Sequence, residues 1–320
     1  MTTEPYVLII STKPDTATDD VIRHLHAKGI AHYRINTEDY PFQHTITHTP
    51  GATEWLSCND ELIPAPSSIW YRRLRTPPTP TDMDEGVANF CRQETRAALV
   101  GSIIGQRTRW MSHPARIWQA EHEPYQLQVA ASLGLRIPPT IITNNPAKIK
   151  EAFTTYGRMI AKPARYGHIV NQGTEYAIYT SQVLREHLDE IESARWSPAI
   201  YQELIPKAAD IRVTIIGDTI LAASIDSQSD AAAMIDWRQT ENPQLPHERH
   251  ALPHALEGKL RSLMHTLQLT FGAIDLIKTP SGEYVFLEIN PSGQWLWLDD
   301  ILNLDISATV ANWLAAPCHT

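Results

Sequence analysis

Two side chains that offer oxygen ligands lie two residues apart near the end of the chain, at Glu288 and Asn290. The run 284–290 alternates with the period of a strand, so we expect both side chains on one face and Leu287 on the opposite face. Two oxygen ligands aimed at one point predict a binding site. The alternative is that they form the solvent-exposed face of an ordinary edge strand, because such short motifs also occur by chance.

A second strand with a carboxylate is expected directly before this one. The run 272–279 has a strand pattern and reaches the next strand through a Pro-Ser-Gly turn, which predicts an antiparallel hairpin. The hairpin would add Asp275 to Glu288 and Asn290. Two carboxylates and an amide form a hard oxygen site, which suits Mg²⁺ that carries phosphate groups.

Lys162 stands in a short apolar run, 159–163, that predicts a buried strand. Burying an unpaired ammonium group is costly, so this lysine requires an anionic partner. A nucleotide phosphate would serve as that partner, and so would a carboxylate in a structural ion pair.

Arginines end or occupy two other predicted strands. Arg72 and Arg73 end the short predicted strand 68–73, where they form either a solvated face or a clamp for a carboxylate or phosphate. Arg212 shares a face with Asp210 on the strand 210–217, which turns through a tight hairpin into the next strand.

The composition excludes several classes of protein. The 320 residues are 42% hydrophobic, which supports a real core, and no apolar run approaches the ~20 residues of a membrane span. A formal net charge of −9 without a Lys/Arg block argues against a nucleic-acid binder. The three cysteines are far apart, the 14 histidines are scattered, and the N-terminus lacks a basic signal region. We therefore expect a cytoplasmic protein without disulfides.

The chain opens with a β-α-β pattern, a strand at 6–10, a helix that Gly29 ends and a strand at 30–35, which predicts a small α/β domain. It contains no GxGxxG, so a dinucleotide fold is not supported. Further along, apolar spacing predicts an amphipathic helix through 184–191, and polar, proline-bearing composition predicts a loop over 227–255.

These features follow one another in an order that resembles the ATP-grasp ligases. A lysine on a strand comes first, then a hinge segment at 202–205 and a strand with a DxR motif, and last the carboxylate Asp275 and the ExN motif of Glu288 and Asn290. Shorter stretches are similar to microviridin-type graspetide synthetases, the ATP-grasp maturases of ribosomal peptides, and particularly to their actinobacterial branch. These stretches are 69–73, 110–114, 134–140, 225–228, 235–238 and 288–297. The resemblance spans nearly the whole chain.

The resemblance implies an α+β / α/β architecture, an ATP-grasp fold in which antiparallel sheets enclose the nucleotide. It divides the chain into an N-terminal pre-ATP-grasp α/β domain at 1–115, a central ATP-grasp subdomain at 116–198 and a C-terminal subdomain with the metal site at 199–320.

The same resemblance implies the ligands. ATP would be bound by Lys162, Gln202, Glu203, Leu204, Ile205, Asp210 and Arg212. Lys162 would hold the α- and β-phosphates, Glu203 would accept from the adenine amino group, and Asp210 would lie near the ribose or phosphates. Mg²⁺ would be bound by Asp275, Glu288 and Asn290.

The implied reaction is phosphorylation of a Glu or Asp side chain of a ribosomal precursor peptide, followed by attack of a Thr/Ser hydroxyl or Lys amine. The rings would be ω-esters or ω-amides. Arg212 and Arg238 would be catalytic, and Arg72, Arg73 and Arg238 would bind the substrate; for Arg238 a structural salt bridge is an equal alternative. The implied partner is a precursor peptide with a leader and a Thr/Glu/Asp-containing core. We expect neither nucleic acid nor a membrane as a partner. The resemblance also implies homodimers.

One position departs from the family pattern. Many relatives carry a nucleotide-binding lysine at the start of a KPxQ segment, where this chain has Glu123 in 123–126. A carboxylate cannot hold phosphate, so either another cation, with Arg165 and His168 as candidates, supplies the charge or nucleotide affinity is weaker. Two other functions therefore stay open: a ligase that joins an amino acid to a small molecule or protein end, and a low-turnover nucleotide- or peptide-binding protein.

Overall fold

The computed structural model describes residues 6–52, 55–75, 79–80, 82–165, 167–171, 174–240, 242 and 245–317. The chain forms two compact units. Unit 1 comprises Met1–Ile117, Leu269–Phe271 and Gln294–Thr320, and unit 2 comprises Trp118–Gln268 and Gly272–Gly293. The predicted three-domain division stays a prediction.

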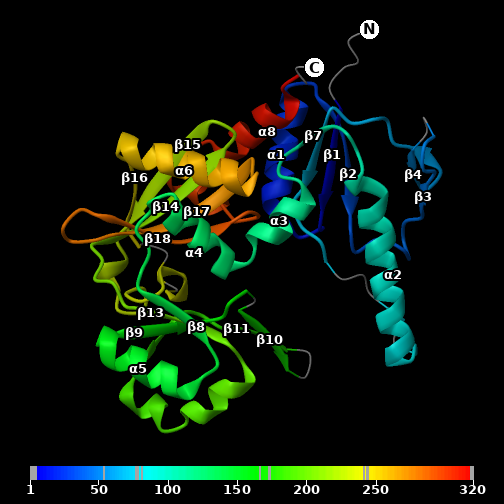
Figure 1. Cartoon of the computed structure of the whole chain (residues 1–320). Coiled ribbons are helices and arrows are strands. Elements are labelled where there is room, and N and C mark those ends of the chain that lie inside the picture. The colour runs from blue at the N-terminus through cyan, green and yellow to red at the C-terminus, as the bar shows by residue number, and fades with distance from the viewer. Residues whose placement is uncertain are drawn as a thin grey trace. The chain divides into compact units, whose positions relative to one another are not determined.

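Unit 1 contains a parallel four-stranded sheet in the order β2-β1-β6-β7 (Figure 1). Its strands are β1 Tyr6–Ser11, β2 Ala31–Asn36, β6 Ser68–Tyr71 and β7 Arg109–Trp110. Its helices are α1 Thr16–Ala27, α2 Glu85–Ile104, α7 Leu296–Leu302 and α8 Ile306–Ala315, and α3 Pro114–Ala120 leads into unit 2. A small antiparallel sheet is formed by β3 Ile46–His48, β4 Leu56–Cys58 and β5 Glu61–Leu62.

Local sequence explains why these elements form. The centre of β1, Val7 to Ile10, is fully buried, as expected of a parallel strand covered on both faces. Helix α1 buries Val21 and Leu25 and contacts α8, whereas α2 lies on the other side of the sheet (Figure 1). The Asp84 side chain accepts from the first amides of α2 and so fixes the start of this helix. The predicted β-α-β opening is confirmed.

Unit 2 contains two antiparallel sheets. The first has the order β12-β9-β13-β8 and is accompanied by the hairpin β10-β11. Its elements are β8 Thr140–Thr143, α5 Pro146–Tyr156, β9 Met159–Lys162, β10 His168–Asn171, β11 Thr174–Ala177, β12 Ser181–Val183 and β13 Ala199–Glu203. The preceding helix, α4 Glu123–Ser132, contacts the second sheet instead.

The second sheet has the order β16-β15-β14-β17-β18. Its elements are β14 Ala209–Ile216, β15 Thr219–Ile225, β16 His247–Arg249, α6 His254–Leu267, β17 Phe271–Lys278 and β18 Tyr284–Asn290. Gly217 has φ of 54°, which suits the tight turn predicted between β14 and β15. The predicted mixed architecture with antiparallel sheets is confirmed.

Two predictions about elements are wrong. The apolar spacing at 184–191 does not form an α-helix but two short 3-10 helices, Arg185–Leu188 and Ile191–Trp196. Leu188 and Ile191 instead pack on the core formed by α5 and β13, whereas Leu184 is exposed, so burial rather than helical period sets the conformation. The run 227–255 is not entirely loop, since it contains β16, which pairs with β15.

Other global expectations concern cysteines and membranes. Cys58 and Cys91 are free, and Cys318 lies outside the described residues. Among the described helices, none combines the length and apolar character that a membrane crossing requires.

Candidate active site

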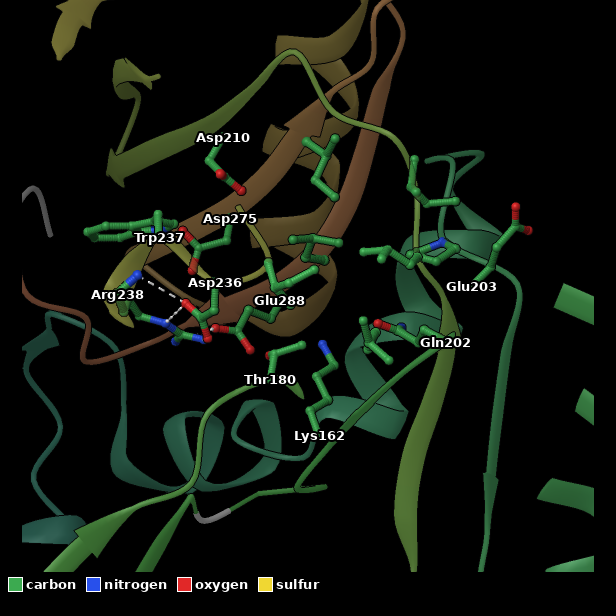
Figure 2. A pocket seen from close by; sticks show the side chains of 17 residues that line it. Lys162, Thr180, Gln202, Glu203, Asp210, Asp236, Trp237, Arg238, Asp275 and Glu288 are labelled. Atoms are coloured by element: carbon green, nitrogen blue, oxygen red, sulfur yellow. Dashed lines mark hydrogen bonds and ion pairs between the residues drawn. The ribbon is translucent and has the colours of Figure 1, made fainter. Parts of the chain in front are cut away.

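A recess in unit 2, here called the ligand recess, lies where the two antiparallel sheets face each other (Figure 2). Its empty space, including the part open to solvent, is about 640 Å³. Strands β9 and β13 line one wall, and β14, β17 and β18 line the other. Its lining includes most of the predicted nucleotide and metal ligands, namely Lys162, Gln202, Glu203, Leu204, Ile205, Asp210, Asp275 and Glu288, together with Arg238.

The apolar part of the ligand recess depends on an irregularity in β18. The register places Asp275 opposite Glu288 but Leu276 opposite Phe286, so Leu287 is an extra residue in a β-bulge. As a result Leu287 and Glu288 both line the recess, although strict alternation predicted them on opposite faces. The prediction of opposite faces is wrong because the bulge breaks the period of two. The bulge also brings the apolar side chain of Leu287 into the recess, which Ile277 lines as well.

The hinge segment borders the recess with groups that are already engaged. The buried Gln202 amide donates to Thr140 Oγ1 at 3.1 Å, and the Leu204 amide donates to the Arg158 carbonyl at 2.9 Å. The Glu203 carboxylate points away from the centre of the recess (Figure 2). The main chain of Glu203, rather than its carboxylate, is therefore the group nearer to the hollow.

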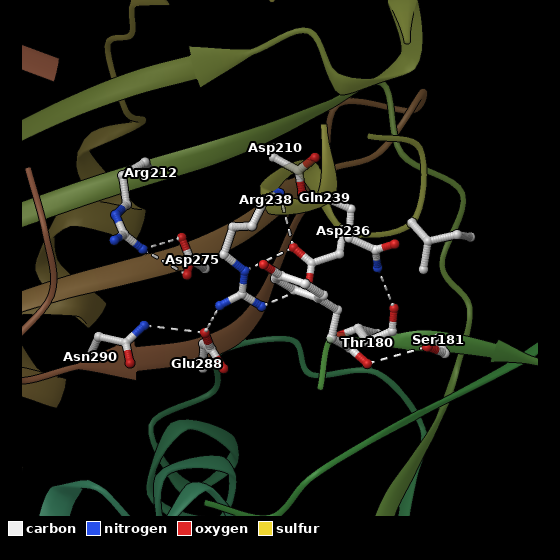
Figure 3. Close-up of polar contacts among 12 residues, drawn as sticks. Thr180, Ser181, Asp210, Arg212, Asp236, Arg238, Gln239, Asp275, Glu288 and Asn290 are labelled. Carbon is white, nitrogen blue, oxygen red and sulfur yellow. Dashed lines mark hydrogen bonds and ion pairs between the residues drawn. The ribbon is translucent and has the colours of Figure 1, made fainter. Parts of the chain in front are cut away.

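The two predicted metal carboxylates are cross-strand neighbours, and each faces an arginine (Figure 3). Arg212 Nη1 donates to both carboxylate oxygens of Asp275, at 2.7 and 2.8 Å. Burial raises the pKa of Asp275, and the charge of Arg212 opposes this rise. Burial also opposes ionisation of Glu288, but Lys162 and Arg238 outweigh it, so the pKa of Glu288 is lowered.

Arg238 is held in place by Asp236, whose role the sequence did not predict. Arg238 Nε and Nη2 each donate to the Asp236 carboxylate at 2.8 Å, a bidentate pair that fixes the guanidinium plane (Figure 3). The remaining Nη1 lies 3.3 Å from Glu288 Oε1. Asn290 donates to the same Glu288 oxygen at 3.2 Å. The stretch 235–238 had been singled out by resemblance, and this was the only sequence signal for Asp236.

Lys162 forms an ion pair with Glu123, the residue that departs from the family pattern. Both side chains are almost entirely buried. Burial raises the pKa of Glu123 to about 7, while Lys162 acts in the opposite direction. The lysine also points toward Glu288 (Figure 2), so it has two carboxylates nearby and borders the space where an anionic ligand would lie.

Two other predicted residues, Asp210 and Arg165, are also engaged. Asp210 pairs with Lys207 at 2.7 Å, a lysine that the sequence analysis did not identify, and burial raises the pKa of Asp210. Arg165 donates to Glu121 at 2.7 Å. The side chain of His168 lies outside the described part of the structure.

Arg72 and Arg73 belong to unit 1, and the structure gives Arg72 a structural environment. Its guanidinium is buried, lies 3.4 Å from Asp15 and donates to Gln294 Oε1 at 3.0 Å. It also stacks 4.6 Å from the centre of the Trp295 ring. Arg72 therefore stabilises the core of unit 1, whereas a contact with substrate stays a prediction that the more exposed Arg73 fits better.

A second space, here called the outer hollow, adjoins the ligand recess, and its empty space, including the part open to solvent, is about 1000 Å³. It shares Lys162, Thr180, Arg238 and Glu288 with the recess and adds Asn290 and Glu123. Among the described residues, no group of three or more His, Cys, Asp or Glu has the arrangement of a metal site. Two adjacent carboxylates still fit a magnesium ion whose other ligands are phosphate oxygens and water.

Comparison with known proteins agrees with this architecture. A family model described as the MvdD pre-ATP grasp domain matches residues 6–117. The macrocyclase MdnC from Microcystis aeruginosa MRC, solved with its precursor peptide MdnA, is 32% identical with a TM-score of 0.86, covering 96% of this chain and 98% of MdnC. No curated protein sequence matches the chain.

Two further solved structures are similar over their whole length. The RiPP-associated ATP-grasp ligase of Chryseobacterium gregarium, in complex with ADP and a leader and core peptide, is 27% identical with a TM-score of 0.85, covering 98% of each chain. The macrocyclase MdnB from Microcystis aeruginosa MRC is 32% identical with a TM-score of 0.78, covering 97% of this chain and 99% of MdnB. The chain therefore belongs to the ATP-grasp macrocyclases of ribosomal peptides, the graspetide synthetases, and is an ATP-dependent ligase.

Proposed function

We propose that this enzyme uses ATP and Mg²⁺ to activate Glu or Asp side chains of a ribosomal precursor peptide and to close them into rings with Thr, Ser or Lys side chains. The observation that carries the proposal is the paired arrangement of Arg212 with Asp275 and Arg238 with Glu288 at the border of the ligand recess. It combines carboxylates suited to a metal with cations suited to a phosphoryl group. The similarity to ligases solved with ADP and with peptides supports it.

In this proposal the ligand recess binds the nucleotide. Ile277 and Leu287 would pack on the adenine, and the main chain of 203–205 would border its polar edge. Lys162 would bind phosphate groups in place of its present partner, Glu123. Asp275, Glu288 and Asn290 would bind the metal, which when present neutralises phosphate charge.

The reaction would occur where the ligand recess meets the outer hollow. A peptide carboxylate oxygen attacks the γ-phosphorus of ATP, which gives an acyl phosphate and releases ADP. A hydroxyl or amine of the same peptide then attacks the acyl carbon, loses its proton and displaces phosphate, so each ring removes one water from the peptide. Arg212 and Arg238 would stabilise the charge on the transferring phosphoryl group, and Asp236 would keep Arg238 oriented.

The substrate would be a precursor with a leader and a core that contains Thr and Glu or Asp. The side chains that line the outer hollow include Lys162 and Arg238, which suit an incoming carboxylate. We also propose that the enzyme can act as a homodimer, as the sequence resemblance implies.

The test is intact mass spectrometry of a candidate precursor, encoded next to the gene, after incubation with enzyme, ATP and Mg²⁺. We expect the loss of one water per ring. Glu288→Gln removes a metal ligand and should abolish that loss, whereas Glu248→Gln changes an exposed carboxylate of the same sheet and should leave it unchanged.

Two outcomes would contradict the proposal. Consumption of ATP with a free amino acid, and no change in the mass of the precursor, would indicate an amino acid ligase. Undiminished ring formation by Glu288→Gln would show that the metal and phosphoryl chemistry takes place elsewhere.

A further inference from the structure

Unit 1 contains a hollow of its own, here called the arginine pocket. It lies between α2 and the segments that follow β2 and β6, and its empty space, including the part open to solvent, is about 730 Å³. Arg92 and Arg96 line it from the helix, and Arg75 lines it from the segment after β6. Among the described residues that form its wall, none is acidic.

The three guanidinium groups are available to a ligand. Arg92 and Arg96 are four residues apart on α2, so they project from the same face of the helix. Arg92 Nη1 donates to Thr79 Oγ1 at 3.0 Å, a neutral partner that leaves its charge uncompensated. In the part of the chain that the structure describes, no ion pair joins Arg75, Arg92 or Arg96 to a carboxylate.

The position of the arginine pocket in the fold also indicates a binding site. Thr37 follows the carboxyl end of β2 and Arg75 follows that of β6, and the Arg75 amide donates to Thr37 Oγ1 at 2.9 Å. All strand pairs in this sheet are parallel, and α1 and α2 cover opposite faces (Figure 1). Open parallel sheets bind ligands outside the carboxyl ends of their strands, where the chain direction of the crossovers reverses.

Charge and chemistry identify the ligand. The whole chain has a formal net charge of −9, so it repels an acidic peptide except where cations are concentrated. Guanidinium forks match carboxylates, and the Asn89 and Gln93 amides beside them can bind peptide groups. Leu74 and Leu99 add apolar surface for a side chain stem.

We propose that the arginine pocket binds an acidic segment of the peptide substrate through its Glu or Asp carboxylates. This inference rests on the proposed function and adds a binding site in unit 1 to it. The pocket binds carboxylates without activating them, since none of the residues proposed to bind the metal or ATP belongs to unit 1.

The test is fluorescence anisotropy of a fluorescein-labelled synthetic peptide of Thr-Glu repeats, titrated with the full-length enzyme without ATP. Arg92→Gln and Arg96→Gln should each weaken binding about tenfold, the effect of one lost charge-assisted hydrogen bond. The matched control is Arg23→Gln on α1, an exposed arginine of the same unit, which should bind like the wild type. A second peptide, of Thr-Gln repeats, lacks the carboxylates. The affinity of the wild type for it should be no higher than the affinity of the two variants for the acidic peptide.

Equal affinity of wild type, Arg92→Gln and Arg96→Gln for the acidic peptide would overturn the proposal. So would variants that lose affinity for ATP but not for the acidic peptide, because a phosphate would then be the ligand. Ring formation measured separately on the precursor distinguishes the two hypotheses: an active enzyme whose pocket variants bind normally refutes the pocket alone. An inactive enzyme whose pocket variants bind tenfold more weakly refutes the proposed reaction alone.

Discussion

At the scale of single residues, the pair of Lys162 and Glu123 links the departure from the family pattern to the chemistry of the recess. Lys162 borders both the ligand recess and the outer hollow, and Glu123 borders the latter. Because burial raises the pKa of Glu123 to about 7, the charge of this carboxyl changes near neutral pH. A protonated Glu123 would compete less strongly with phosphate for Lys162.

We expect Glu123→Gln to change how the stability of the protein depends on pH. A folded-state pKa above the ordinary 4.5 means that Glu123 contributes stability that is fully present below pH 4.5 and is lost as the pH rises through about 7. The wild type should therefore lose about 3 kcal/mol relative to the variant across this window. Calorimetric melting of both proteins over the window measures the difference.

A matched control for this prediction is Glu151→Gln. Glu151 pairs with Lys148 at 2.7 Å on the surface, where both side chains are more than 60% exposed. Its removal should leave the pH dependence of the melting temperature close to that of the wild type. If the melting temperatures of the wild type and Glu123→Gln changed with pH in parallel, burial would not raise the pKa of the Glu123 carboxyl.

At the scale of elements, the hairpin of β17 and β18 is shaped by a bulge and by a close turn. The turn after β18 packs on β17 at Gly293, where a Cβ atom would overlap with Ala273 Cβ and lie 3.3 Å from Asn290 Cβ. Glycine is therefore required at this position by the neighbouring strand rather than by its own backbone angles. The same turn holds the end of β18, where Asn290 contacts Glu288.

We expect Gly293→Ala to destabilise the protein by about 1–3 kcal/mol, because the added methyl group forces the turn away from β17. Thermal unfolding should show a lower melting temperature. Gly258→Ala on α6 is the control, since its Cβ would meet open space and should raise stability by up to ~1 kcal/mol. A melting temperature of Gly293→Ala at or above that of the wild type would contradict the proposed close packing.

At the scale of the whole molecule, unit 1 is assembled from both ends of the chain. Ser68 Oγ donates to the carbonyl of Leu314 at 2.8 Å, which joins β6 to α8. Trp295 is fully buried, stacks on Arg72 and donates through its indole to Ser307 Oγ at 2.9 Å. The N-terminal sheet therefore depends on residues that follow unit 2 in the sequence.

We expect Trp295→Ala to cost about 3–5 kcal/mol of unfolding free energy, because it removes a large buried side chain and leaves the guanidinium of Arg72 without its ring partner. Urea denaturation followed by circular dichroism measures the loss. Trp196→Ala is the control, since Trp196 is 92% exposed and its removal should change stability by no more than about 0.5 kcal/mol. Equal denaturation midpoints for the two variants would show that Trp295 does not hold the ends together.

The sequence predicted many elements because their signals are local. The continuous apolar run of β1 and the glycine after α1 each reflect burial or a cap within one element. It failed at 184–191, where Leu188 and Ile191 have helical spacing but pack on α5 and β13 from short 3-10 turns. There a tertiary contact, not the local period, decides the conformation.

The sequence by itself determined which side chains can do chemistry: a lysine in an apolar strand, the carboxylates Asp275 and Glu288, and an arginine on the neighbouring strand. Residue type suffices for this, because it fixes the charge and the ligand atoms that each side chain offers. Only the tertiary structure decided the partners. It placed Glu123 on Lys162, Asp236 on Arg238 and Leu287 beside Glu288, because ion pairs between distant segments and a strand bulge depend on how the sheets pack.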